Sequence, residues 1–201
     1  IAVTHDISGA KKEKKGSAFT YPGLVHLYQN EMVFEQAAML QYGQDVIISH
    51  SNQPRVHTTY VTPELHQMLA TPLALGRMFS ESEALNTSNP VAILSYDTWQ
   101  KTFDGRSDIL EQTIVLSGVS YRIIGIVAEQ FVEPTIQQVG QETAIWLPWD
   151  FNQQSEFSRA SYGNISGSLK FIGKLKPDLS ASQAEQLLTS LVDERWQQGV
   201  A

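Results

Sequence analysis

The chain contains no cysteine among its 201 residues, and it has no long apolar run. The missing thiols exclude a disulfide framework, a cysteine nucleophile and any metal site with cysteine ligands. An α-helix needs roughly 20 apolar residues to cross a bilayer, and no stretch of the sequence approaches that length. The first residue is Ile1 rather than Met, so we interpret the chain as a fragment cut from a longer protein.

Charge is sparse and unbalanced. Only 17% of the residues are charged, and the formal net charge is −7. Nucleic acid is therefore excluded as the main partner, because phosphate binding needs clustered Lys and Arg. Docking of the folded surface on anionic lipid is disfavoured for the same reason. Hydrophobic residues make up 42% of the chain, which is enough for a packed core.

Catalytic signatures are also missing. The segment 163–167 reads G-N-I-S-G and does not match the G-x-S-x-G pattern of a nucleophile elbow. No Walker-type phosphate loop occurs, and no G-x-G-x-x-G follows a strand. The acidic pairs Glu81/Glu83 and Asp193/Glu194 fall on predicted helix termini and faces, where carboxylates are common without catalysis. We predict that the chain is not an enzyme and has neither catalytic residues nor a cofactor.

The five histidines do not form a metal-binding pattern. None belongs to H-E-x-x-H or to another tight ligand spacing. His50 and His57 could approach each other across a turn at 51–54, either as polar strand residues or as metal ligands. The first interpretation is the simpler one, so no metal site is predicted.

Two tryptophans are the candidate functional residues. Trp146 and Trp149 flank Leu147-Pro148 at the end of a predicted strand. Both rings could pack in the core, or they could form an exposed aromatic pair that contacts a partner protein. Trp146 and Trp149 are therefore a candidate partner interface.

Hydrophobic periodicity predicts short strands mixed with short helices. The clearest elements are a hairpin over 112–127, with its turn at Ser117-Gly118, and a final amphipathic helix capped by Ser180 and Gln183. The stretch 34–40 fits either a helix or a strand, and 150–167 is predicted to be a loop. Further helices are predicted to start near Tyr21, Pro63, Ser80 and Ser95, and strands at 46–48, 56–61, 91–94, 144–147 and 169–175.

This mixture predicts an α+β fold with two subdomains. Residues 1–18 are rich in Gly, Ser and Lys, which predicts a flexible arm next to a membrane. The hairpin-rich middle, residues 62–165, is predicted to be a small subdomain inserted into another one. That other subdomain is then discontinuous and consists of residues 19–61 and 166–201.

Six segments, taken in order, resemble the MacB-like periplasmic core domain of FtsX-like ABC-transporter permeases. The resemblance covers roughly residues 20–198, and it departs from the family at Ser117, where Asn is commoner, and at Asp178, where Gly is commoner. The segments are V-T-P-E-L at 61–65, P-L-A-L-G-R-M-F at 72–79, V-A-I-L-S-Y at 91–96 with Trp99 and Phe103, the hairpin at 114–127, I-W-L-P at 145–148 and I-G-K-L-K-P at 172–177.

The resemblance implies an extracytoplasmic domain at the periplasmic face of the bacterial inner membrane. Membrane segments would flank the fragment, and the discontinuous subdomain would be the porter-like one. The implied partners are an ABC ATPase on a separate domain or subunit, a second permease in a membrane dimer, and a periplasmic adaptor protein, as in efflux. The implied function is transmission of ATP-driven motion to an envelope substrate or partner. The alternative is direct recognition of a lipid, peptide or antibiotic.

Three residues of the second segment and the hairpin have expected structural roles. Gly76 and Gly125 are expected to permit close backbone approach or an unusual φ. Arg77 is expected to pair with an acidic side chain inside the middle subdomain rather than to bind a ligand.

Overall fold

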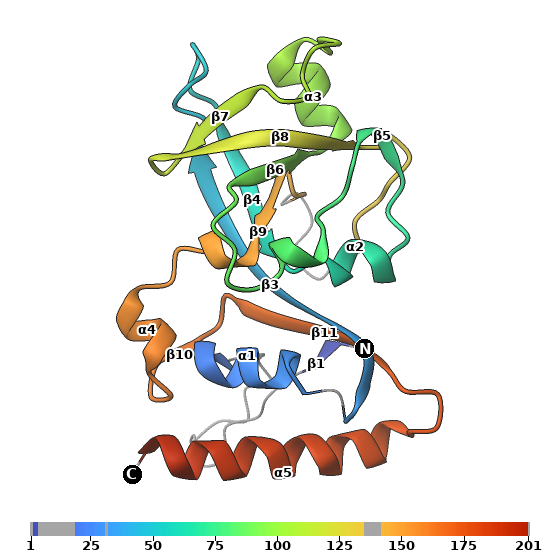
Figure 1. Ribbon diagram of the computed structural model, residues 1–201, viewed down its shortest axis with the longest axis vertical. Coiled ribbons are helices and arrows are strands. Elements are labelled where there is room, and N and C mark those ends of the chain that lie inside the picture. Colours follow the sequence, from blue (N-terminus) through green and yellow to red (C-terminus); the bar gives the residue numbers. More distant parts are fainter. Residues whose placement is uncertain (1, 4–18, 31, 135–141, 201) are drawn as a thin grey trace. The chain divides into compact units, whose positions relative to one another are not determined.

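The computed structural model describes residues 2–3, 19–30, 32–134 and 142–200 (Figure 1). The chain divides into two compact units. We call residues 1–40 and 153–201 the host unit, and residues 41–152 the inserted unit. Most of the predicted arm, residues 4–18, lies outside the described residues.

The boundaries of the inserted unit differ from the predicted boundaries at 62 and 165. Residues 55–61 form a strand that pairs with residues 145–148, so this segment belongs to the inserted unit. Residues 165–166 pair with residues 19–20, which places them in the host unit. Hydrophobic periodicity identifies strands but not their partners, and the partners decide the boundary.

The described residues of the host unit form three helices and several strands. Strand β1 pairs antiparallel with β11, and β10 pairs antiparallel with β2. Helix α1 lies between β11 and α5 and contacts both (Figure 1). The elements are β1 (Ala2–Val3), β2 (Phe19–Thr20), α1 (Tyr21–Tyr28), the first part of β3 (Phe34–Val46), α4 (Glu156–Ala160), β10 (Ile165–Ser166), β11 (Leu169–Leu175) and α5 (Ala181–Val200).

Two helices of the host unit begin where the sequence predicts. Thr20 caps α1 by accepting a hydrogen bond from Gly23 N–H at 3.2 Å. The predicted box at the start of α5 is confirmed, since Ser180 N–H donates to Gln183 Oε1 at 2.9 Å and Gln183 N–H donates to Ser180 Oγ at 3.3 Å. The ambiguous stretch 34–40 is part of a strand.

The prediction of a loop over 150–167 is wrong in part. Helix α4 occupies five of these residues, and its cap is Ser155, whose Oγ accepts from Ser158 N–H at 3.1 Å. A single helical turn has too few apolar positions to show a helical period, so the sequence could not reveal it.

The inserted unit is built on a mixed sheet with the strand order β3-β4-β9-β6-β8-β5, in which β7 also pairs with β8. Pairs β4–β9 and β6–β8 are parallel, whereas β5–β8, β6–β9 and β7–β8 are antiparallel. The elements are the rest of β3, β4 (Arg55–Val61), α2 (Glu64–Met68), β5 (Leu73–Gly76), η1 (Glu81–Glu83), β6 (Val91–Leu94), α3 (Tyr96–Phe103), β7 (Thr113–Leu116), β8 (Val119–Val127), β9 (Ile145–Pro148) and η2 (Trp149–Phe151). Mixed helices and strands in sheets of mixed orientation confirm the α+β class.

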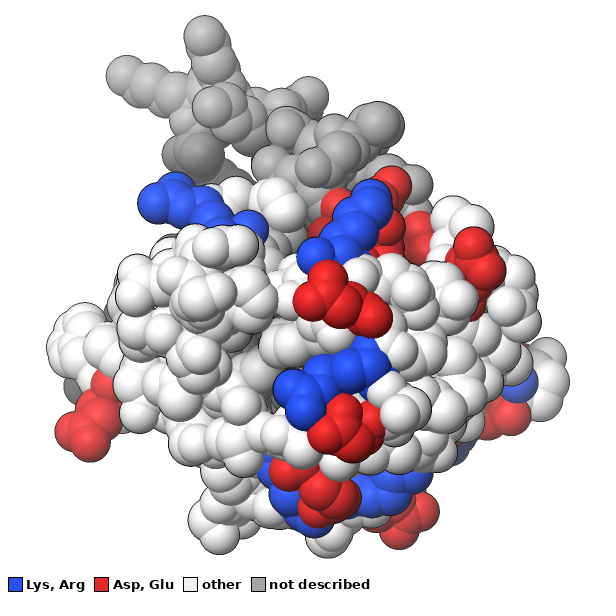
Figure 2. All heavy atoms as spheres, turned by 90° about the horizontal axis from the view of Figure 1, so that it is seen from above, with Lys and Arg blue, Asp and Glu red and all other residues white. Residues whose placement is uncertain are grey.

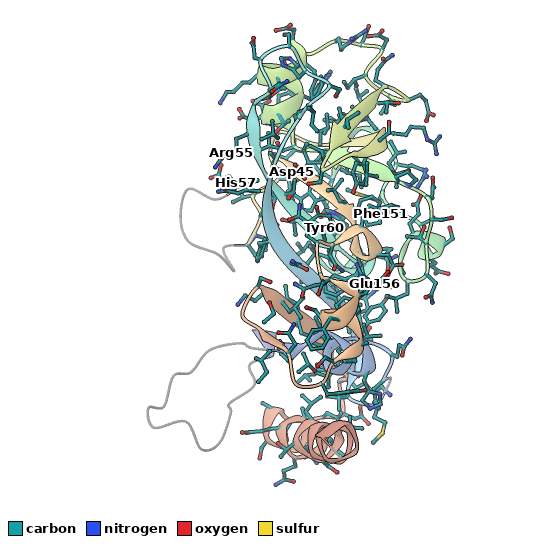
Figure 3. All side chains as sticks on the ribbon, turned by 90° about the vertical axis from the view of Figure 1, so that its left-hand side faces the viewer. Asp45, Arg55, His57, Tyr60, Phe151 and Glu156 are labelled. Atoms are coloured by element: carbon teal, nitrogen blue, oxygen red, sulfur yellow. The ribbon has the colours of Figure 1, made fainter. Side chains whose placement is uncertain are left out.

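Side chains alternate between the two faces of this sheet. Arg55 and His57 project from one face of β4, and Tyr60 projects from the other (Figure 3). Tyr60 joins the main core, which is covered by Trp99 and Phe103 of α3. The other members of this core are Ile47, Val56, Ala92, Leu94, Ile109, Ile114, Leu116, Tyr121, Ile123, Ile126, Ile145 and Leu147.

The predicted hairpin is confirmed as β7 and β8. Ser117 has φ 48° and Gly118 has φ 80°, which is the positive-φ pair that a tight two-residue hairpin turn needs. Ser117 Oγ donates to Asp45 Oδ2 at 2.7 Å, a contact that helps hold this non-glycine residue in its left-handed conformation.

Candidate functional site

Both tryptophans of the candidate interface lie inside the inserted unit. Trp146 stands opposite Thr59 of β4 and Ile93 of β6, and the residue is 2% exposed. Trp149 opens η2 and is 0% exposed. A partner interface needs accessible rings, so their burial supports core packing and gives no support to an exposed aromatic pair.

The Trp146 ring lies at the middle of a cluster that joins three parts of the inserted unit. His66 of α2 and Phe131 are its edge-on neighbours, with ring centroids 5.5 Å and 6.4 Å away. His66 also packs against Phe79 at 6.1 Å. Tilted and edge-on ring contacts are favourable, so the cluster holds α2 against the sheet on the face opposite to the main core.

His66 is buried with one ring nitrogen hydrogen-bonded. Its Nδ1 lies 3.2 Å from Thr71 Oγ1, whereas Nε2 has no hydrogen-bond partner among the described residues. Burial lowers the pKa of the imidazole to about 4, because the charged ring would lose its hydration. His66 is therefore neutral at physiological pH, as its aromatic surroundings require.

Glu133 is a second buried titratable group near the same indole. Its Oε2 accepts a hydrogen bond from Thr143 N–H at 3.3 Å, and the Thr143 hydroxyl lies 2.6 Å from that of Thr59. Burial raises the pKa of the Glu133 carboxyl, and the Thr143 hydrogen bonds only partly offset this effect. No sequence pattern indicated Glu133, because this residue lies outside the helices and strands, between β8 and β9.

Arg77 and Glu83 form the ion pair that the sequence predicts inside the middle of the chain. Two parallel hydrogen bonds join them, from Nη1 to Oε2 and from Nη2 to Oε1, both 2.9 Å. Glu83 is 2% exposed and also accepts from Ser80 N–H at 2.7 Å and from Asn89 Nδ2 at 2.9 Å. Burial raises the pKa of Glu83, but the Arg77 and Ser80 hydrogen bonds outweigh it and hold this pKa below its ordinary value.

This ion pair is structural. Every oxygen of the Glu83 carboxylate is occupied by donors of its own unit, so the group has no free lone pair directed at a ligand. Ser80 and Glu83 form a capping box that opens η1, at the place where the sequence predicts a helix start. The prediction that Arg77 pairs with an acidic side chain in the middle of the chain is confirmed.

Gly76 and Gly125 place the backbones of β5 and β8 unusually close together. They are register partners, and Gly76 has φ 73°. A Cβ atom at Gly76 would lie 2.1 Å from Ile124 O, and one at Gly125 would lie 2.3 Å from Arg77 O. The expectation of close approach or of an unusual φ is confirmed.

The two histidines considered as metal ligands have separate partners. His57 Nδ1 is 3.3 Å from Gln44 Nε2, and His50 Nδ1 accepts a hydrogen bond from Asn52 N–H at 3.2 Å. Within the described part of the chain, no group of three His, Asp or Glu side chains is placed to hold a metal ion. Nor does that part contain a helix that is both long and apolar enough for a membrane span.

The part of the sequence that forms this ion pair and the β7–β8 hairpin is similar to a known family. The sequence model of the MacB-like periplasmic core domain matches residues 4–191. The chain belongs to the MacB-like periplasmic core domain family. Members of this family are periplasmic domains of ABC-transporter permeases, which confirms the resemblance found in the sequence. No curated protein matches this MacB-like domain in sequence.

Solved structures share the fold of this MacB-like domain. The periplasmic region of MacB from Actinobacillus actinomycetemcomitans has a TM-score of 0.64 at 14% identity, over 96% of this chain and 81% of that one. A domain of a candidate permease from Porphyromonas gingivalis reaches 0.69 at 15% identity, over 94% and 76%. The extracellular domain of the noncanonic ABC-type transporter YknZ from Gram-positive bacteria reaches 0.59 at 15% identity, over 89% and 84%.

Proposed function

We propose that this domain transmits ATP-driven motion from a membrane-embedded ABC permease to an envelope substrate or partner protein. ATP is hydrolysed on a separate nucleotide-binding domain or subunit, and the domain itself catalyses no reaction. In this proposal two permeases pair in the inner membrane, and a periplasmic adaptor is a further partner. Membership of the permease family supports the ATPase partner.

Strand β3 is the observation that carries this proposal. Its residues 34–40 belong to the host unit, and its residues 41–46 belong to the inserted unit. A β-strand is close to fully extended, at about 3.3 Å per residue, so it stretches little when pulled, unlike a Gly/Ser-rich linker. We propose that a displacement of the host unit reaches the inserted unit along this strand and shifts the inserted unit relative to α5.

Helix α5 is the element that we propose receives the motion. It extends over Ala181–Val200 and contacts α1, which in turn contacts β11. Strand β11 is the neighbour of β3 in the sheet. A packed route of helix, helix and strand thus connects α5 with β3 inside the host unit, which supports a lever role for α5.

Distance measurements between two spin labels test this proposal in the full-length protein, reconstituted with its ATPase in lipid nanodiscs. This chain lacks cysteine, so Ser182→Cys on α5 and Ser107→Cys in the inserted unit supply the labelling sites. ATP with a hydrolysis block is expected to change the distance between these labels. A matched pair inside the inserted unit, Ser82→Cys with Ser107→Cys, is expected to keep its distance.

Either of two outcomes would count against transmission. One is a distance between the first pair that is the same with and without nucleotide. The other is a distance that changes when a lipid, peptide or antibiotic is added without nucleotide, which would favour the alternative function of direct ligand recognition.

A further inference from the structure

Two exposed apolar side chains of the host unit stand on neighbouring segments. Phe157 belongs to α4 and is 73% exposed, and Ile165 belongs to β10 and is 37% exposed. Asn164 Nδ2 donates to Ser158 Oγ at 2.6 Å, so the residue before Ile165 is bonded to the residue after Phe157. Figure 1 shows α4 beside β10. We call residues 157–165 the α4–β10 surface.

The α4–β10 surface is tied to the start of α1. Ile165 is the register partner of Thr20, which caps this helix. Arg159 Nη1 donates to the Tyr21 hydroxyl at 2.7 Å, and its guanidinium lies 4.8 Å from the centroid of the Tyr21 ring. A surface that is ordered before contact loses less conformational entropy when it meets a partner.

The charge around this surface does not oppose contact with an anionic partner. Residues 157–177 contain no Asp or Glu and four basic residues, namely Arg159, Lys170, Lys174 and Lys176. Glu156 and Asp178 border this stretch, and Glu35 pairs with Lys174 at 3.0 Å, so the excess of positive charge is small. Apolar contact therefore has to supply most of the attraction, with electrostatics as a minor addition.

The inserted unit is electrostatically unsuited to an anionic partner. It contains five basic and twelve acidic side chains. Figure 2 shows basic and acidic side chains alternating along one face, and four of the five basic side chains are held in ion pairs. These pairs are Arg77–Glu83 at 2.9 Å, Lys101–Asp97 at 2.7 Å, Arg106–Asp108 at 2.6 Å and Arg122–Glu111 at 2.7 Å. An anionic surface repels such a unit, so the host unit is the one that can approach it.

The size of the α4–β10 surface suits a lipid bilayer better than a protein. A stable protein interface buries about 800 Å² on each partner, which is more than two exposed apolar side chains and their small polar neighbours provide. An aromatic and an aliphatic side chain next to Arg and Lys are, in contrast, the residues with which proteins enter the boundary between lipid headgroups and acyl chains.

We propose that the α4–β10 surface rests on the lipid bilayer, with Phe157 and Ile165 at the boundary between headgroups and acyl chains. Two apolar side chains are too few to hold a free domain on a membrane. The proposal therefore rests on the proposed function in one respect, because the membrane segments of the permease keep the host unit close to the bilayer and raise its effective concentration there. The contact gives the host unit a point of support on the bilayer when α5 moves.

Fluorescence quenching by nitroxide-labelled lipid tests this contact in the full-length protein, held in nanodiscs without nucleotide. Ala160→Cys supplies the fluorophore site, because this chain has no cysteine and Ala160 is exposed on the same side of α4 as Phe157. Any cysteine outside this chain is first replaced by serine. We expect quenching about threefold stronger at Ala160→Cys than at Val132→Cys, an 83% exposed position of the inserted unit.

Substitutions at Phe157 separate lipid contact from general effects. Phe157→Ser is expected to reduce the quenching at Ala160→Cys to about half, and Phe157→Trp is expected to retain it, because Trp also favours the bilayer interface. Met32→Ser is the matched control, since it removes a 54% exposed apolar side chain of the same unit beyond the opposite end of α1. We expect Met32→Ser to leave the quenching unchanged.

Equal quenching at Ala160→Cys and Val132→Cys, or quenching that Phe157→Ser leaves unchanged, would overturn the proposal. So would a blue-shifted fluorophore at Ala160→Cys that nitroxide lipid does not quench, because a protein would then cover the surface. The quenching is read without nucleotide, whereas transmission is read as a nucleotide-dependent distance between spin labels. A failure of one proposal is therefore distinguishable from a failure of the other.

Discussion

The host unit and the inserted unit divide the charge of the chain very unequally. Nine basic and nine acidic residues leave the host unit neutral, whereas the inserted unit carries the whole formal charge of −7. The argument from net charge against anionic lipid surfaces therefore applies to the inserted unit alone. A whole-chain charge describes neither unit when one unit is inserted into the other.

The two units are alike in exposing a few large apolar side chains. The host unit exposes Phe157 to 73%, Met32 to 54% and Ile165 to 37%. Among the described residues of the inserted unit, Ile48 and Val132 are exposed to 49% and 83%. Charge rather than apolar exposure therefore distinguishes the two units, and the following predictions test how separate they are.

Alanine at Gly76 or at Gly173 should have the largest effect, each in its own unit. At Gly76 the new Cβ would meet Ile124 O at 2.1 Å with φ 73°, and at Gly173 it would meet the Phe34 ring at 2.2 Å. We expect either variant to lower the free energy of unfolding by about 3 kcal/mol or more, measured by urea denaturation. Gly118→Ala, with no atom within 4 Å of the new Cβ, should cost only about 1–2 kcal/mol.

Hydrogen exchange on the same variants shows whether the units open separately. Gly76→Ala should speed amide exchange in residues 41–152, and Gly173→Ala should speed it in the host unit. A uniform increase over both units in either variant would contradict this separation.

Arg77→Ala should have the second-largest effect, which is a loss of stability of the inserted unit. It leaves the buried Glu83 carboxylate with its Ser80 and Asn89 donors only. Since Arg77 itself is 48% exposed, we expect a loss of about 2 kcal/mol at pH 7, measured by urea denaturation. Because the folded pKa of Glu83 is lowered, this loss should shrink as the pH falls through that pKa. Arg106→Ala, which removes an exposed pair, should change nothing measurable.

A fall in pH should lower the free energy of unfolding of the inserted unit, because His66 takes up a proton when this unit unfolds. Its folded pKa of about 4 lies below the ordinary value of 6.5, so the unfolded chain binds the proton more tightly. The contribution of neutral His66 to stability is fully present above pH 6.5. It decreases as the pH falls toward 4, by about 2 kcal/mol between pH 7 and pH 5. His66→Gln should abolish this decrease in urea midpoints, whereas His57→Gln should retain it.

Phe157→Ser in the host unit should have the smallest effect. The ring is 73% exposed, so its removal should change the free energy of unfolding by less than about 0.5 kcal/mol. A loss above about 1 kcal/mol in urea denaturation would mean that other groups cover the Phe157 ring in solution, so that the host unit exposes less apolar surface than described above.

Local structure was predictable where a few neighbouring residues decide it. The caps at Ser95 and Ser180, the Ser117-Gly118 turn and the strands at 91–94 and 169–175 depend on adjacent residues, and all are present. The roles of Gly76 and Arg77 were also predictable, because both residues belong to the segment 72–79, which resembles the family as a whole.

Features that depend on distant partners were not predictable. The parallel pairing of β4 with β9 joins residues far apart in sequence, and it decided the boundary of the inserted unit. The burial of Trp146, Trp149 and Glu133 depends on the same sheet. Hydrophobic patterns show that a residue is apolar, but not which side chains cover it.

The insertion of one unit into the other also sets an order of assembly. The inserted unit is complete once Asn152 has been synthesised, because all of its strands lie between residues 41 and 152. The host unit must wait for β11, whose Ile172 pairs with Ala2 at the opposite end of the chain. During synthesis the acidic unit can therefore fold first, while β1 remains unpaired until β11 has emerged.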